Sequence, residues 1–207
     1  MENTLGYELS NGGSIPSGRT INNIMKSSCY RSLNFDFSYL KSNFNLEEVT
    51  EFGSKFKSED ILSPQLLNFL DEIELSVPHV QVWFYPTTVK ESSIHIDHHY
   101  AYDEVNLNFV HNGQGSTVNW YSPQDSYQGY LSANKYGIVR RYNIDKLFLL
   151  NSAELTGPCL FQSGIPHNVS KVPEINRWCV TAAIRKNNKF LLWKDAMVLF
   201  RRYIAES

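Results

Sequence analysis

The stretch EVNLNFVHNGQGSTVNWY, residues 104–121, indicates how this chain folds. Apolar side chains at Val105, Leu107 and Phe109 alternate with polar ones, and a period of two is typical of a β-strand with one packed face. The dipeptide Asn112-Gly113 then marks a turn, and a second run of β-forming residues follows it. We therefore expect two strands here, the first with an opposite face formed by Asn106, Asn108 and Val110.

Further runs of the same kind follow Pro78 and are rich in Val, Ile, Phe, Tyr and Trp. With the two runs above, they predict eight strands, at 80–85, 93–97, 104–110, 116–121, 147–150, 159–162, 167–172 and 177–184. Turn residues separate these runs. Short strands of this number in one chain favour an antiparallel double sheet.

Helical spacing flanks the strands on both sides. Ser63 before Pro64 is a typical helix start, and the next apolar residues share one helix face: Leu66, Leu67, Leu70 and Ile73. Residues 190–203 return to this period. The chain is therefore predicted to be mostly β with flanking helices. We expect one domain over 1–207, made of a polar N-terminal arm at 1–32, packing helices at 33–77, a β core at 78–185 and a C-terminal helix at 186–207.

The composition excludes several classes of protein. The 207 residues are 42% hydrophobic and 14% aromatic, which does not fit a chain that is disordered throughout. A formal net charge of -2 gives no overall attraction for a polyanion, so nucleic acid is not expected as a partner. The first residues lack the features of a secretory signal, and no apolar run approaches the roughly 20 residues that span a membrane. We expect a cytoplasmic protein without membrane contact.

Three cysteines, Cys29, Cys159 and Cys179, lie far apart without a CxxC pair and are expected to be reduced thiols. Residues 122–146 are predicted to be an irregular connection. A loop of this length in a compact domain is either a lid or binding loop, or a surface insertion. It contains Arg140 and Arg141, which either recognise an acidic substrate or are solvated charges.

The first candidate for a functional site is the run His95-Ile96-Asp97-His98-His99. If 93–97 is a strand, His95 and Asp97 lie on one face and the isoleucines on the other. The polar pair then either faces a cavity or is solvated. His98 and His99 follow the strand directly, where they are rim residues or substrate contacts.

A second group is His167 and Arg177. Residues 172–176 interrupt the strand pattern, so 167–172 and 177–184 are predicted to form a hairpin. Reflection about its midpoint places His167 opposite Arg177 on one face, with Cα atoms ~4.5–5.5 Å apart. A buried arginine without a carboxylate is costly, so this arrangement requires an anion from the protein or from a ligand.

Two histidines and one carboxylate form the face that holds Fe(II) and leaves positions open for a bidentate 2-oxo acid and dioxygen. A nearby arginine can pair bidentately with the far carboxylate of that acid. The order of His95, Asp97, His167 and Arg177 along the chain suits this assembly.

With these residues, about 80–185 resembles the Fe(II)/2-oxoglutarate-dependent dioxygenases, and in particular the prolyl-hydroxylase-like members. Tyr85-Pro86, ten residues before His95, is similar to the Tyr-Pro that lines the oxo-acid pocket there. The resemblance implies a double-stranded β-helix, which is a cupin-like jelly-roll. It also places Asn108 inward, where we count it with the residues that bind the co-substrate.

The resemblance implies that His95, Asp97 and His167 bind Fe(II) as the catalytic centre, and that Arg177 binds the distal carboxylate of 2-oxoglutarate. Relatives often carry Ser or Thr two residues after this arginine. Cys179 stands there, and we expect Thr181 or Tyr85 to supply the second contact. Dioxygen is the oxidant, and the products are a hydroxylated substrate, succinate and carbon dioxide.

The expected substrate is a small molecule such as a free amino acid, or a peptide side chain. Two alternatives stay open at this point: a cupin-like metal hydrolase or isomerase with the same ligands, and a non-catalytic jelly-roll binding module.

Overall fold

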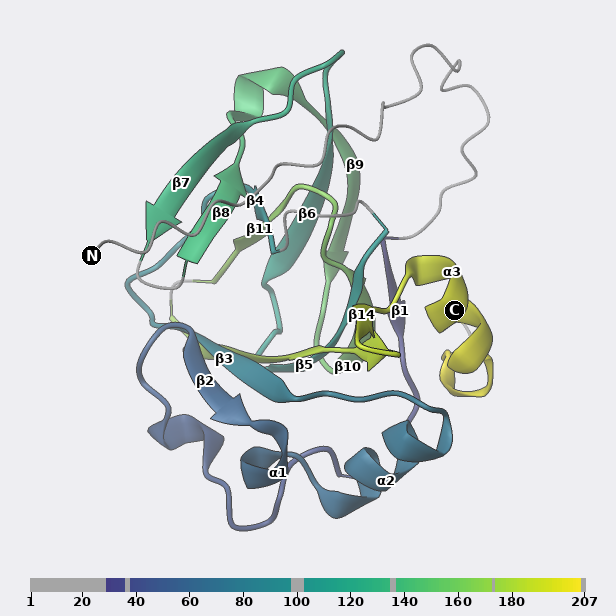
Figure 1. Ribbon diagram of the computed structural model, residues 1–207. Coiled ribbons are helices and arrows are strands. Elements are labelled where there is room, and N and C mark those ends of the chain that lie inside the picture. The colour runs from purple at the N-terminus through teal and green to yellow at the C-terminus, as the bar shows by residue number, and fades with distance from the viewer. Residues whose placement is uncertain (1–28, 36–37, 98–102, 135–136, 173, 206–207) are drawn as a thin grey trace, which may run out of the picture.

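The computed structural model describes residues 29–35, 38–97, 103–134, 137–172 and 174–205. Strands dominate these residues, and most of them belong to two large antiparallel sheets that lie one above the other (Figure 1). The predicted fold class, mostly β with flanking helices, is confirmed at this level. The N-terminal arm predicted at 1–32 lies outside the described residues except for its last four.

The first sheet, the lower one in Figure 1, has six strands. In spatial order they are β1 (Tyr30–Ser32), β10 (Pro158–Gln162), β5 (Val105–His111), β12 (Arg177–Ala183), β3 (His79–Tyr85) and β2 (Ser54–Lys57). The second sheet also has six, in the order β7 (Tyr130–Asn134), β8 (Gly137–Arg141), β4 (His95–Ile96), β11 (His167–Ser170), β6 (Thr117–Pro123) and β9 (Leu147–Glu154). All eight predicted strands are present, with ends that differ by a few residues.

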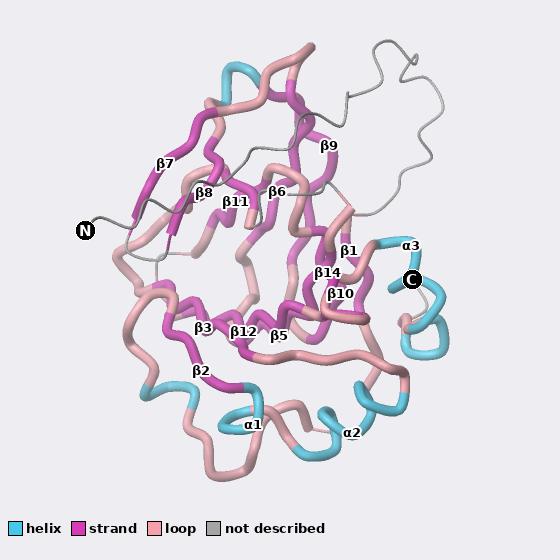
Figure 2. Tube along the Cα trace, in the orientation of Figure 1, coloured by secondary structure: helices cyan, strands magenta, loops and turns pink. Residues whose placement is uncertain are grey.

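The chain passes repeatedly from one sheet to the other. After β3 in the first sheet it enters β4 in the second, returns to β5, and crosses again to β6. It crosses three more times later, through β10, β11 and β12. Consecutive strands at these crossings, β3 to β6 and β9 to β12, therefore alternate between the two sheets (Figure 2).

The two faces of the first sheet have different partners. Val105, Leu107 and Phe109 of β5 belong to a large apolar cluster that includes residues of the helices, such as Leu66 and Leu70. The opposite face of β5, with Val110, packs toward the second sheet in a separate cluster. The predicted alternation of this strand is confirmed, and it separates the supporting core from the space between the sheets.

Three α-helices support the first sheet: α1 (Ser58–Ile61), α2 (Pro64–Glu72) and α3 (Trp193–Leu199). The helix start predicted at Ser63 is confirmed, because its side chain accepts a hydrogen bond from the backbone of Leu66. Short 3-10 helices occur at η1 (Leu46–Glu48), η2 (Ile144–Lys146) and η3 (Arg201–Tyr203). No helix in the described part of the chain is long and apolar enough to cross a membrane.

The predicted packing-helix region, 33–77, is only partly helical. It also contains β2, which extends the first sheet by pairing with β3. The predicted C-terminal helix region, 186–207, begins with a small hairpin of β13 (Arg185–Lys186) and β14 (Lys189–Phe190). Its turn residues, Asn187 and Asn188, have φ of 51° and 63°, as the tight two-residue hairpin turn requires. The helix therefore begins only at Trp193.

The irregular connection predicted at 122–146 was wrong. It contains the hairpin of β7 and β8, and β8 pairs with β4, so this segment extends the second sheet. The described side chains of this hairpin, at 130–133 and 139–141, are all at least partly exposed, because the hairpin lies at the edge of the sheet. They therefore lack the clean alternation of a strand with one packed face.

Candidate metal centre

A cavity between the two sheets has an empty volume of about 510 Å³, its open mouth included. From the first sheet it is lined by β3, β5, β10 and β12, and from the second by β4, β6 and β11. Apolar side chains form much of the wall, and the polar ones among them are Tyr85, His95, Asp97, Asn108, His167, Arg177, Cys179 and Thr181. The predicted site residues therefore line one cavity.

His95, Asp97 and His167 form a compact group within this cavity. The metal-binding atoms that they offer all lie within 4.8 Å of one another. Nε2 of His95 and Nε2 of His167 are each 3.4 Å from Oδ1 of Asp97. The side chain of His167 is 5% exposed, whereas those of His95 and Asp97 are 23% and 19% exposed, so the group opens toward the cavity mouth on their side.

Strand pairing brings these three residues together. His95 on β4 is the cross-strand partner of His167 on β11, although 72 positions separate them in the sequence. Partners in an antiparallel pair project to the same face. Asp97 lies two residues after His95, just beyond the end of β4, so its side chain points to the same side as that of His95. Its backbone N–H donates to the carbonyl of Ser163 at 3.1 Å, which holds the chain in this extended direction.

Both imidazoles are held in one tautomer by backbone carbonyls. Nδ1 of His95 lies 2.8 Å from the carbonyl oxygen of Ser93, and Nδ1 of His167 lies 2.8 Å from that of Ile165. Because a carbonyl oxygen only accepts, each Nδ1 carries the hydrogen and donates it. In each neutral ring Nε2 then presents its lone pair to the carboxylate, which is the arrangement of a metal-binding histidine.

The charges of the three groups are strongly coupled. Burial by itself would raise the pKa of Asp97, but the neighbouring imidazoles outweigh it and hold that pKa well below its usual range. Burial would lower the pKa of His95, and the hydrogen bond and charge of Asp97 more than offset this effect, so the pKa is raised. The site therefore attracts a positive charge, which is a proton on an imidazole or a bound cation.

The second carboxylate oxygen of Asp97 has its own partner. Nδ2 of Asn106 on β5 donates to Oδ2 of Asp97 at 3.0 Å. Oδ1 is left facing the two Nε2 atoms. Together the three side chains offer two imidazole nitrogens and one carboxylate oxygen, a donor set that suits Fe(II) and other divalent transition metals.

Arg177 lies at the start of β12 and is 2% exposed. Its guanidinium carbon is 5.6 Å from the ring centre of Tyr85, which is its cross-strand partner on β3. None of the ion pairs found among the described residues involves Arg177, and its buried Nε has no hydrogen-bond partner. A buried cation in a cavity without an acidic partner favours the binding of an anion.

The expected hairpin between His167 and Arg177 was wrong. The strand that begins at His167 pairs with β4 and β6 in the second sheet, whereas Arg177 pairs with β3 and its strand with β5 in the first. The two residues meet because they line the same cavity from opposite sheets. The chain between the end of β11 at Ser170 and the start of β12 at Arg177 thus passes from the second sheet to the first instead of turning within one sheet.

The remaining predicted co-substrate residues also line the cavity. Thr181 and Cys179 share the inward face of β12 with Arg177, and Oγ1 of Thr181 lies 3.6 Å from Sγ of Cys179. Asn108 projects from β5, and its buried Oδ1 has no hydrogen-bond partner within the described ranges. Burial raises the pKa of Cys179, so this thiol stays protonated at neutral pH. As expected, Cys29, Cys159 and Cys179 form no disulfide among the described residues.

One aromatic residue at the cavity mouth, Phe52, was not predicted from the sequence. Phe52, from the loop before β2, is 42% exposed and packs its ring 5.0 Å from that of Trp83 and 5.4 Å from that of Tyr85. An isolated aromatic residue in a polar loop carries no sequence signal for this position. Trp83 also lines the cavity and packs against the apolar cluster between the sheets. His98 and His99 lie outside the described residues.

The comparisons with known proteins leave the family open: no family model matches this chain, and no curated protein matches it either.

Proposed function

We propose that this protein is an Fe(II)- and 2-oxoglutarate-dependent dioxygenase that hydroxylates a small molecule or a peptide side chain. The observation that carries the proposal is the pairing of two features in one cavity. One is a metal-binding group of two histidines and one aspartate, and the other is a buried Arg177 without an acidic partner.

The fold supports the proposal. We propose that the two sheets form a cupin-like jelly-roll, or double-stranded β-helix. Its eight core strands are β3, β4, β5, β6, β9, β10, β11 and β12. These strands wind between the sheets so that β10, β5, β12 and β3 are neighbours, in this order, in one sheet, and β4, β11, β6 and β9 in the other. This architecture positions side chains from both sheets around a common interior.

Separate groups of residues would bind the metal and the co-substrate. His95, Asp97 and His167 would hold Fe(II), with Asn106 orienting the carboxylate. Arg177 would bind the distal carboxylate of 2-oxoglutarate, with Tyr85, Thr181 and Asn108 on the neighbouring walls. When bound, iron supplies the oxidising power with dioxygen. In the balanced reaction, one atom of O₂ enters the C–H bond of the substrate and the other enters succinate, and carbon dioxide is released from the oxo acid.

The test is an anaerobic titration of the full chain with Fe(II) and then 2-oxoglutarate, monitored by the weak visible charge-transfer band of the chelate. We expect a band at one equivalent of iron that disappears in His167→Ala. In Arg177→Gln it should need about 100-fold more 2-oxoglutarate, because a charge-assisted bidentate contact contributes about 3 kcal/mol. Arg202→Gln, at an exposed arginine of η3, is the matched control and should leave the titration unchanged.

Two other outcomes would overturn the proposal. Stoichiometric binding of a divalent metal without a 2-oxoglutarate-dependent band would favour the metal hydrolase or isomerase, in which Arg177 has no assigned role. Failure to bind any divalent metal would favour a non-catalytic binding module.

A further inference from the structure

A second hollow opens directly outside the metal cavity. It shares four lining residues with that cavity, Phe52, Trp83, Tyr85 and His95, and its empty volume is about 870 Å³ with the open mouth included. We call it the outer groove. Its other walls are Phe84, Pro86, Val89, Ser92, Ser93, Val139 and Arg141. A molecule in the outer groove would therefore lie against one of the proposed metal ligands.

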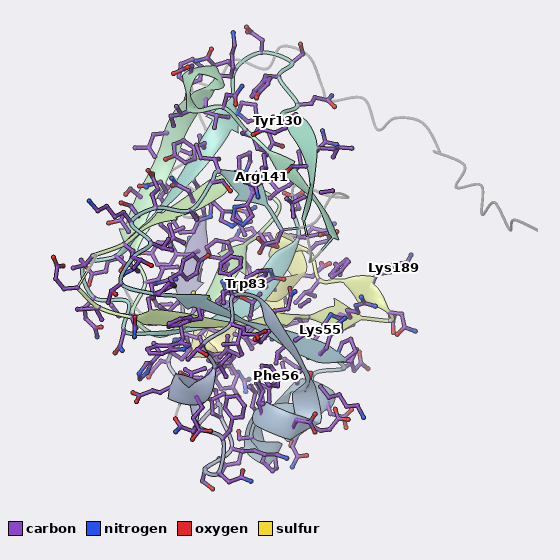
Figure 3. All side chains as sticks on the ribbon, turned by 90° about the vertical axis from the view of Figure 1, so that its left-hand side faces the viewer. Lys55, Phe56, Trp83, Tyr130, Arg141 and Lys189 are labelled. Atoms are coloured by element: carbon purple, nitrogen blue, oxygen red, sulfur yellow. The ribbon has the colours of Figure 1, made fainter. Side chains whose placement is uncertain are left out.

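Arg141 is the charged group of the outer groove. It is the last residue of β8 and the cross-strand partner of His95, so the two side chains project to the same face. Figure 3 looks onto this edge of the molecule, with Arg141 on the second sheet and Trp83 on the first. The cation is thus placed at the entrance to the metal centre.

The guanidinium of Arg141 is only partly used by the protein. Its Nη1 donates to Oγ of Ser93 at 3.0 Å, and its buried Nε has no hydrogen-bond partner in the described part of the chain. The ion pairs found among the described residues do not include Arg141. A guanidinium with unused N–H groups and no acidic partner among the described residues favours an anion, and its planar donor pattern matches a carboxylate.

The other groove residues restrict the rest of the ligand. Phe52, Trp83, Val89 and Val139 offer apolar surface, and no acidic side chain lines the groove among the described residues. An ammonium group would find no counter-charge there, and its desolvation would be uncompensated. The groove chemistry therefore disfavours a zwitterionic amino acid.

We propose that the outer groove binds a small apolar carboxylate without a free ammonium group, with its carboxylate on Arg141 and its apolar body against Phe52 and Trp83. An N-acylated amino acid or an arylalkanoate has this chemistry. That the ligand is also the substrate rests on the proposed function, whereas its binding does not.

The test is calorimetric titration of the full chain with matched probes. N-acetyl-phenylalanine and 3-phenylpropionate should bind at least about tenfold more tightly than their neutral amides, as expected for a charge-assisted contact of about 1.5 kcal/mol or more. Free phenylalanine should bind as weakly as the amides. Equal affinity for acids and amides, or the absence of binding by both acids at millimolar concentration, would overturn the proposal.

Variants of the two neighbouring arginines identify the contact. Arg141→Gln should reduce the affinity of each acid to that of its amide, and Arg141→Lys should restore part of the difference. Arg140→Gln is the matched control, because Arg140 alternates with Arg141 along β8 and its Nη1 donates to the carbonyl of Gln128 at 2.8 Å. Equal losses in Arg140→Gln and Arg141→Gln would overturn the assignment.

The two experiments distinguish a failure of the groove assignment from a failure of the proposed function. If the acids bind through Arg141 but no iron and 2-oxoglutarate chelate forms, the groove assignment stands and the dioxygenase proposal fails. If the chelate forms through Arg177 but acids and amides bind alike, only the groove assignment fails. A chelate that depends on Arg141 and not on Arg177 would contradict both.

Discussion

Nδ2 of Asn106 lies 3.0 Å from Oδ2 of Asp97 and connects the start of β5 to the carboxylate of the candidate metal centre. Removing this contact in Asn106→Ala should weaken divalent metal binding by about 10 to 100-fold, the usual effect of losing a group that orients a metal ligand. Competition with a chelator measures the affinity. Asn143→Ala, at an exposed residue far from the cavity lining, is the control. Equal affinities in the two variants would remove Asn106 from the site.

Arg177 is expected to destabilise the metal-free protein. Its buried guanidinium has no acidic partner, so Arg177→Met should increase the free energy of unfolding by about 1 to 3 kcal/mol while abolishing the 2-oxoglutarate-dependent band. Urea unfolding with a chelator present measures the first effect. Arg202→Met, at an exposed arginine, should change neither property. A destabilised Arg177→Met variant would show that the cation already has a stabilising partner.

Glu104 should make stability depend on pH. Burial, and to a smaller extent the charge of Asp97, raises its pKa from an ordinary 4.5 to about 7. Between these pH values the folded protein binds more protons than the unfolded chain. The contribution of Glu104 to the free energy of unfolding is therefore present below pH 4.5 and is lost as the pH rises through 7. The free energy of unfolding of metal-free Glu104→Gln, relative to that of the wild type, should therefore be greater at pH 8 than at pH 5, by on the order of 2 kcal/mol.

Urea unfolding at the two pH values measures this difference. Glu72→Gln, at an exposed position of α2, is the control and should shift the free energy of unfolding by the same small amount at both. If the stability of Glu104→Gln follows that of the wild type across this range, Glu104 does not titrate as described.

Ser63 makes two hydrogen bonds at the start of α2. Its Oγ accepts from the backbone N–H of Leu66 at 3.2 Å and donates to the carbonyl of Ser38 at 2.6 Å. Ser63→Ala should lower the free energy of unfolding by about 1 to 2 kcal/mol. Ser63→Thr keeps both groups and should lose less than half of that. Thermal or urea unfolding is the measurement, and equal losses in the two variants would contradict the capping role.

Local patterns in the sequence were sufficient for several parts of the fold. The alternation of Val105, Leu107 and Phe109 predicted the packed face of β5, because side chains in a strand point to opposite faces in turn. Ser63-Pro64 predicted the start of α2 for an equally local reason. The spacing of His95 and Asp97 likewise placed both on one face, since only two residues separate them.

Only the tertiary structure decided which distant residues meet. Local periodicity does not specify the partner of a strand, so the sequence led to a hairpin for 167–184, whereas the structure separates His167 and Arg177 into two sheets that face one cavity. For the same reason, the sequence did not reveal that β8 pairs with β4 and brings Arg141 beside His95. Strand pairing and burial across the sheets determine these contacts, and they arise from the packing of the whole chain.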